Sequence, residues 1–139
     1  MDLKSFETLP ISARIQVITA FVEAVAVANW YFLKNNPNTP GLFEARVTYE
    51  LKPRPMGLDN WRDIPAVIEA RGGDCKDFVA WRIAQLRIRD LHDVNPIVTA
   101  HKAGGMLLYH VRVRHGGFIE DPSKILGMPS NIDPSLLRR

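Results

Sequence analysis

The segment GGDCKDFVAWRIAQLRIRDL, residues 72–91, decides the fold of this chain. After the glycine pair, apolar residues occupy nearly every side of a helix predicted from about Cys75 to Leu91, as is typical of a buried central helix. Asp74 stands where an N-cap belongs and Asp77 follows three residues later, so a short acceptor and an acidic first turn both favour a helix start here. The sequence therefore predicts a buried helix whose first residue is a cysteine.

Cys75 is the only cysteine of the chain, so it cannot form an intramolecular disulfide, and no cluster with zinc-site spacing surrounds it. At the first position of a helix, the free N–H groups and the dipole lower the thiol pKa, and a thiolate is the nucleophile of acyl-transfer chemistry. The alternative is a structural cysteine packed as a small hydrophobe. The flanking Gly72 and Gly73, which permit close approach of a backbone or substrate, favour the functional interpretation. We expect neither a metal nor a cofactor.

A second candidate group lies on the predicted strand MLLYHVRVR, residues 106–114. Alternation places His110 on the face opposite to Val111 and Val113, and so toward a cleft or solvent. Further strands are predicted at 97–101 and 118–121, with turns at Gly104-Gly105 and His115-Gly116-Gly117.

The turn after this strand decides whether Asp121 reaches His110. If the two-residue loop ends at Gly116, or if the loop has four residues, the two side chains pair directly. If the loop is Gly116-Gly117, Asp121 faces Arg112 and lies diagonal to His110 on the same face. A three-residue loop would send Asp121 to the other face. The glycine pair favours short loops.

These observations together predict a catalytic triad. In it, Cys75 is the nucleophile, His110 is the base that takes its proton, and Asp121 holds the orientation and tautomer of His110. Asp74 and Asp77 shape the start of the cysteine helix.

Outside this core, residues 11–33 are predicted to form a long helix. Packing against the rest of the domain and contact with a partner helix in a larger assembly both fit its apolar stripe. The stripe consists of Ile11, Ile15, Ile18, Val22, Val25, Asn29 and Phe32. Its most apolar part, residues 21–33, contains Glu23 and is too short to cross a bilayer, so no membrane span is expected.

Length and composition indicate a single domain, residues 1–139. The 139 residues include 46% hydrophobic and 24% charged residues, ordinary values for a soluble protein with a sizeable core. The net charge of +3 is scattered, which leaves nucleic-acid binding as a minor alternative. The N-terminus lacks the pattern of a signal peptide, so a cytoplasmic protein is expected. A strand is predicted at 45–51, a short helix around 64–71 and an extended tail over 124–139.

The candidate site residues carry a resemblance to a known family. The run Gly73-Asp74-Cys75-Lys76-Asp77-Phe78-Val79-Ala80 resembles the Gly-Asp-Cys-x-Asp-Phe-Ala signature of transglutaminase-like, papain-type cysteine peptidases. The segments YHVRV, residues 109–113, and GFIEDPS, residues 117–123, resemble the family's His strand and its Asp-Pro-Ser/Thr segment. The order Cys, His, Asp agrees, and the resemblance covers about half of the chain, residues 57–123.

The resemblance implies an α+β fold, with the cysteine helix packed on a small antiparallel sheet in a core over 42–123. It implies hydrolysis or transfer at an amide or isopeptide bond, with a peptide, a glutamine side chain or a peptidoglycan peptide as substrate. Papain-type enzymes often place a Gln before the cysteine as oxyanion donor, whereas this chain has Glu69 there. The Trp61 indole N–H is the replacement we expect, beside the Cys75 N–H.

The wider sequence also resembles small transglutaminase-like proteins encoded in the structural gene regions of tailed phages. This resemblance implies an alternative in which the chain is a virion or assembly protein that retains the fold without catalysis. Phage structural proteins would then be its partners, contacted through the 11–33 helix and the C-terminal tail, in the host cytoplasm or the virion.

Overall fold

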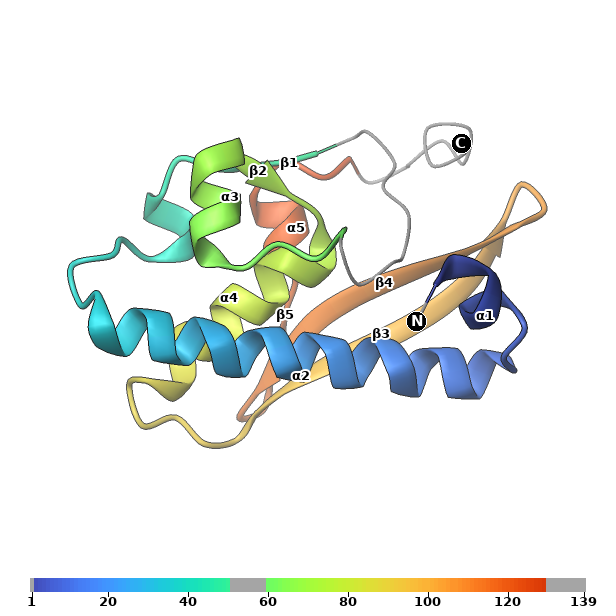
Figure 1. The fold of residues 1–139 in the computed structure, drawn as a ribbon, viewed down its shortest axis with the longest axis horizontal. Coiled ribbons are helices and arrows are strands. Elements are labelled where there is room, and N and C mark those ends of the chain that lie inside the picture. Colours follow the sequence, from blue (N-terminus) through green and yellow to red (C-terminus); the bar gives the residue numbers. More distant parts are fainter. Residues whose placement is uncertain (1, 51–59, 130–139) are drawn as a thin grey trace.

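A computed structural model describes residues 2–50 and 60–129 of the chain (Figure 1). It is a mixed α+β structure with a long N-terminal helix and a small antiparallel sheet, as the sequence predicts. The elements are α1 (Leu3–Glu7), α2 (Ile11–Asn35), the 3-10 helix η1 (Leu42–Glu44), β1 (Thr48–Tyr49), α3 (Ile64–Ala70), β2 (Gly72–Gly73), α4 (Cys75–Arg87), β3 (Val94–Ala103), β4 (Met106–His115), β5 (Phe118–Glu120) and α5 (Pro122–Ile125).

Two sheets organise the strands. The larger is antiparallel in the order β3-β4-β5, and a short parallel pair joins β1 to β2. Helices α2 and α4 pack against each other, and both contact the larger sheet, α2 mainly at β3 and α4 mainly at β4 (Figure 1). The main hydrophobic core therefore lies between this helical layer and one face of the sheet.

Helix α4 is the buried centre that its sequence predicts. Phe78 and Trp81 are fully buried, and ten of its residues are buried in all. The helix begins at Cys75 but ends at Arg87, before the predicted Leu91. The chain leaves the helix through Asp90, which adopts a positive φ of 64°.

The β3–β4 hairpin turns at Gly104-Gly105, where both residues have positive φ as a tight glycine turn requires. Strand β3 begins at Val94, earlier than the predicted residue 97, and it includes Pro96. A proline is tolerated there because β3 is an edge strand of the sheet. On β4, Val111 and Val113 are buried, which confirms the predicted inner face.

Helix α2 spans 25 residues, slightly more than predicted. Its buried residues are Ile18, Val22, Ala26, Asn29 and Leu33. Ile11, at the start of the predicted stripe, remains 44% exposed. The polar Asn29 is explained by its contact, because its side-chain oxygen accepts the Ile64 N–H at 2.9 Å.

The expectation of no membrane span considers only residues 21–33, whereas α2 is longer. By length and composition alone, α2 is long and apolar enough to cross a membrane, with a mean hydropathy of 1.6 over its most apolar window. The continuous helix from residue 11 extends the apolar segment beyond residues 21–33. Core helices and signal sequences meet the same criterion, and in this fold one face of α2 packs in the hydrophobic core.

Two other expectations are corrected. The strand predicted over 45–51 is reduced to β1, because Arg46 adopts a left-handed conformation with φ of 59°; Leu51 lies outside the described residues. The tail is not extended from residue 124, because α5 begins at Pro122 and includes Lys124 and Ile125. Residues 130–139 of the tail lie outside the described residues.

Candidate active site

The start of α4 is fixed by a reciprocal pair of carboxylates. Asp74 accepts the backbone N–H of Asp77, and Asp77 accepts the backbone N–H of Asp74 at 3.1 Å. This capping box satisfies N–H groups that a helix start otherwise leaves without partners. The predicted roles of Asp74 and Asp77 are confirmed, and they place Cys75 at the first helical position.

The carboxylate of Asp77 also anchors the segment that carries Trp61. The second oxygen of Asp77 accepts the backbone N–H of Arg62 at 2.9 Å, and the Arg62 guanidinium donates to the carbonyl of Gly72 at 2.9 Å. Asp77 is 1% exposed. The chain before α3 is thereby tied to the first turn of α4.

The glycine pair before Cys75 serves a tight backbone packing. A Cβ at Gly72 would lie 3.0 Å from the carbonyl oxygen of Thr48, and one at Gly73 would lie 3.1 Å from the Asp77 side chain. Both distances are shorter than ordinary contacts. The close approach expected from the sequence therefore occurs, and the backbone that approaches Gly72 belongs to β1.

Cys75 is partly buried against the core, and the backbone N–H of Val111 lies near its sulfur and favours the thiolate. Burial, followed by the negative charge of Asp74, raises the pKa of the Cys75 thiol to about 12, although the Lys76 ammonium acts in the opposite direction. The expectation of a lowered thiol pKa is therefore wrong. Desolvation and adjacent carboxylates outweigh the helix start, so the resting thiol is protonated at neutral pH.

His110 and Asp121 meet as predicted. The His110 Nε2 atom lies 2.7 Å from Asp121 Oδ2, and both side chains are 17% exposed. With Nε2 bound to the carboxylate, Nδ1 is the ring nitrogen left for a second partner. The other carboxylate oxygen, Oδ1, accepts the Lys124 backbone N–H as the N-cap of α5.

The hairpin uses the second of the predicted registers. His115 pairs with Phe118 and Val113 with Glu120, which leaves Gly116-Gly117 as the loop and sets Asp121 diagonal to His110. Strand β5 ends at Glu120, and none of the strands in residues 2–50 and 60–129 extends this edge of β4 beyond that point. The Val111 N–H lies near the Cys75 sulfur there, so the thiol is next to the backbone that carries His110.

The orientation of β5 is supported by α4. Arg82 of α4 donates two hydrogen bonds to the Glu120 carboxylate, at 2.7 and 3.1 Å, and this bidentate geometry is strong and directional. Since Glu120 precedes Asp121, the ion pair holds the end of β5 against the helix that begins at Cys75.

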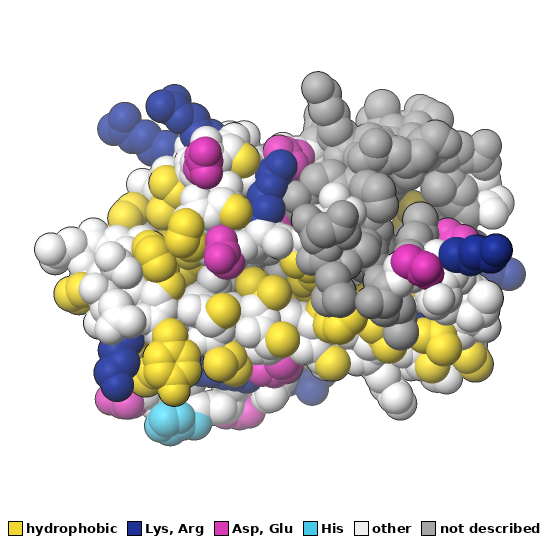
Figure 2. Space-filling model, viewed as in Figure 1, with side chains coloured by type: hydrophobic (Ala, Val, Ile, Leu, Met, Phe, Trp, Pro, Cys, Tyr) yellow, Lys and Arg dark blue, Asp and Glu magenta, His cyan; other side chains and the backbone are white. Residues whose placement is uncertain are grey.

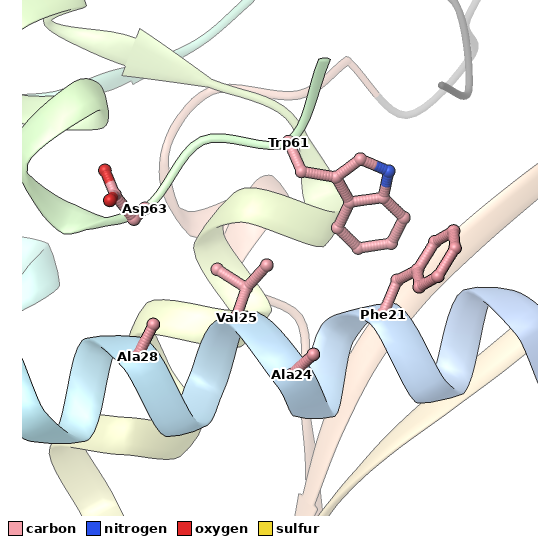
Figure 3. A pocket seen from close by; sticks show the side chains of 6 residues that line it. All are labelled: Phe21, Ala24, Val25, Ala28, Trp61 and Asp63. Atoms are coloured by element: carbon pink, nitrogen blue, oxygen red, sulfur yellow. The ribbon is translucent and has the colours of Figure 1, made fainter. Parts of the chain in front are cut away.

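Trp61 lies between α2 and the start of α4. Its ring packs edge to face against Phe21 and lines an open groove of about 330 Å³ on α2, with Ala24, Val25 and Ala28 (Figure 3). The indole nitrogen is on the ring edge turned away from α2 (Figure 3). This Nε1 atom is buried and has no hydrogen-bond partner in the part of the chain that the structure describes, so its donor capacity is unused.

Lys76 is a site residue that sequence reasoning missed. It is 1% exposed, it forms an ion pair with Asp74, and its Nζ lies 5.4 Å from the centre of the Trp61 ring. Lysine is rarely fully buried unless it is paired. Within the sequence, Lys76 resembles any exposed residue of a first helical turn, so no sequence signal could have indicated its burial.

Among residues 2–50 and 60–129, no group of three or more His, Cys, Asp and Glu side chains could hold a metal ion. Comparison of the chain with protein-family models, with curated proteins and with solved structures finds no match. The described groups of the site are a protonated thiol beside the strand of His110 and an imidazole bound to a carboxylate.

The raised thiol pKa predicts a specific loss of stability in alkali. Between pH 9.0, the ordinary thiol value, and about 12, the unfolded chain releases the Cys75 proton while the folded chain retains it. The free energy of unfolding therefore falls with rising pH, by up to ~1.4 kcal/mol per pH unit from this group alone. Urea denaturation of the native protein and of Cys75→Ala, at several pH values between roughly 8 and 10.5, measures this pH dependence of the free energy of unfolding. Parallel pH profiles for the two proteins would contradict the assigned pKa.

Proposed function

We propose that this protein is a thiol-dependent acyl-transfer enzyme of the transglutaminase-like, papain-type class, with Cys75, His110 and Asp121 as its triad. The observation that carries the proposal is the His110–Asp121 contact at 2.7 Å, on the strand whose next residue, Val111, has its backbone N–H near the Cys75 sulfur. In this proposal the nucleophile, the base and the orienting carboxylate come from α4, β4 and the N-cap of α5.

In the proposed reaction, His110 Nδ1 takes the thiol proton as the sulfur of Cys75 attacks the substrate carbonyl. A thiol with a pKa of about 12 needs this base during the attack, since almost no thiolate exists beforehand. The imidazolium is stabilised by Asp121 and then protonates the leaving amine. Water or an acceptor amine releases the acyl group from the sulfur.

Two donors are proposed for the oxyanion of the tetrahedral intermediate. The first is the backbone N–H of Cys75, at the helix start where N–H groups lack intrahelical partners. The second is the unused Nε1–H of Trp61, which the Arg62–Asp77 hydrogen bond holds near the same helix turn. Each such donor contributes roughly 10²–10³ in rate. A peptide, a glutamine side chain or a peptidoglycan peptide is the proposed acyl donor.

Acylation by p-nitrophenyl acetate tests the proposal without knowledge of the substrate. Compared with an unfolded thiol of pKa 9.0, an unassisted thiol of pKa about 12 should react at least ~30-fold more slowly at neutral pH, because the thiolate fraction falls ~1,000-fold while nucleophilicity rises only partly. We expect the native protein instead to form an acetyl adduct on Cys75 at least as fast as the urea-unfolded chain. Intact-mass spectrometry and nitrophenol release measure both rates, and Cys75→Ala is the blank. Native acylation at the slow unassisted rate would sink the enzyme proposal.

A second candidate is the non-catalytic virion or assembly protein. Exposed apolar side chains on α2 favour it: Val27 is 53% exposed and Tyr31 is 58% exposed, and Figure 2 shows hydrophobic side chains gathered along this helix. In that case α2 and the C-terminal tail would contact phage structural proteins. Cys75 would then be inert, so the acylation experiment separates the two candidates.

A further inference from the structure

Arg112 lies beside the proposed triad on the same face of the sheet. It follows His110 by two residues on β4, which places the two side chains about 7 Å apart along the strand. Val113 of β4 pairs with Glu120 of β5. Continued by one residue, this register places Asp121 opposite Arg112. The guanidinium therefore belongs to the surroundings of the His110–Asp121 pair.

Arg112 has no hydrogen-bond or ion-pair partner in the part of the chain that the structure describes, and its Nε atom is buried. The two carboxylates of the neighbouring segment are already bound. Asp121 binds His110 and the Lys124 N–H. Glu120 accepts both hydrogen bonds of Arg82.

A buried donor nitrogen without a partner is costly, and a guanidinium in this state is prepared to bind an anion. Its planar fork matches a carboxylate in two parallel hydrogen bonds. We propose that Arg112 binds a carboxylate of the substrate, adjacent to the amide that Cys75 attacks. The inference rests on the proposed function and adds a specificity: the preferred acyl donor carries an acidic side chain or a free terminal carboxylate next to the reacting group.

A peptide carboxylate fits this position better than a nucleic-acid phosphate. Binding a phosphate backbone requires a row of exposed cations. Here the Nε of Arg112 is buried next to the triad, and the following residue of the same face, Arg114, is exposed. A single, partly buried arginine is suited to one carboxylate of a substrate held in register with Cys75.

Alkylation with charged and neutral iodoacetyl probes tests this inference. In each reaction the sulfur of Cys75 displaces iodide, and the thiol proton passes to His110 or water. The probes are iodoacetyl-glutamine amide, which is neutral, iodoacetyl-glutamate amide, which carries a side-chain carboxylate, iodoacetyl-glutamine, which carries a terminal carboxylate, and iodoacetyl-phosphoserine amide. Each rate is divided by that of the neutral probe, which cancels any change in thiol reactivity.

We expect at least one carboxylate probe to react about 10-fold faster than the neutral probe, as a charge-assisted pair in a partly exposed site allows. The faster of the two carboxylate probes shows whether Arg112 binds a side-chain carboxylate or a terminal carboxylate. Arg112→Gln should reduce the ratio to about one, Arg112→Lys should retain part of it, and Arg114→Gln should leave it unchanged.

Three results would overturn the inference: a native ratio of about one, an equal loss of the ratio in Arg114→Gln, or a preference for phosphate over both carboxylates. The neutral probe reports separately on the triad. If its rate is the same in His110→Ala while the carboxylate preference persists, the proposed function fails and the Arg112 site stands.

Discussion

Acylation of Cys75 by p-nitrophenyl acetate at neutral pH is expected to slow by about 10²–10⁴-fold when His110 is replaced by alanine. The size of the effect follows from the protonated resting thiol. Burial raises the pKa of Cys75 to about 12, so the sulfur depends on a neighbouring base to lose its proton during attack. The Nδ1 atom of His110 is the group proposed for that task, since Asp121 already binds Nε2.

His101→Ala is the matched control for this measurement. His101 is an exposed histidine of β3, the strand that pairs with β4, and its replacement should change the rate less than twofold, roughly the scatter of surface substitutions. Added imidazole should restore part of the rate to His110→Ala, because a small base can enter the space left by the ring. Equal rates for native protein and His110→Ala would remove His110 from the mechanism, even if Cys75 is acylated.

The parts of the site that sequence reasoning predicted all depend on local rules. The N-cap spacing of Asp74 and Asp77 fixes the start of α4, and the glycine turns fix the hairpins. Alternation along β4 determines which face His110 occupies. Periodicity and capping act over a few residues, so they can be read from the chain itself.

The thiol pKa could not be read in the same way. The position of Cys75 at the helix start predicts a lower pKa, but the observed direction depends on how much solvent the rest of the fold removes. It also depends on the charges of Asp74 and Lys76, and Lys76 packs against the Trp61 ring. Opposing effects of burial and charge cannot be ranked without coordinates.

The register of the β4–β5 hairpin could not be predicted from the sequence either. The glycine pair permits several loops, and the observed one places Gly116 at a φ of 57°. Val113 must be buried in the core while Glu120 reaches Arg82 on α4. These tertiary contacts fit the register in which Asp121 is diagonal to His110. As a further consequence, Arg112 has no partner among the described residues, because its register neighbour Asp121 is bound to His110 instead.

Replacing Asp77 with alanine is expected to lower the free energy of unfolding by about 3–5 kcal/mol, the largest stability effect we expect at the site. The carboxylate is buried and accepts the backbone N–H groups of Arg62 and Asp74, so its loss leaves both donors without that partner. It also releases the segment that carries Trp61 from the first turn of α4. Urea denaturation followed by circular dichroism gives the value.

Asp63→Ala provides the matched control, because Asp63 caps α3 through a single contact with the Ala66 N–H at 3.1 Å and is exposed. A simple exposed cap should cost only ~1 kcal/mol. A loss in Asp77→Ala no greater than in Asp63→Ala would mean that the capping box does not hold the Trp61 segment to the cysteine helix. The second oxyanion donor would then lack its support. A large decrease in the free energy of unfolding of Asp77→Ala, together with slower acylation of the protein that remains folded, would show that this turn supports the reactivity of Cys75.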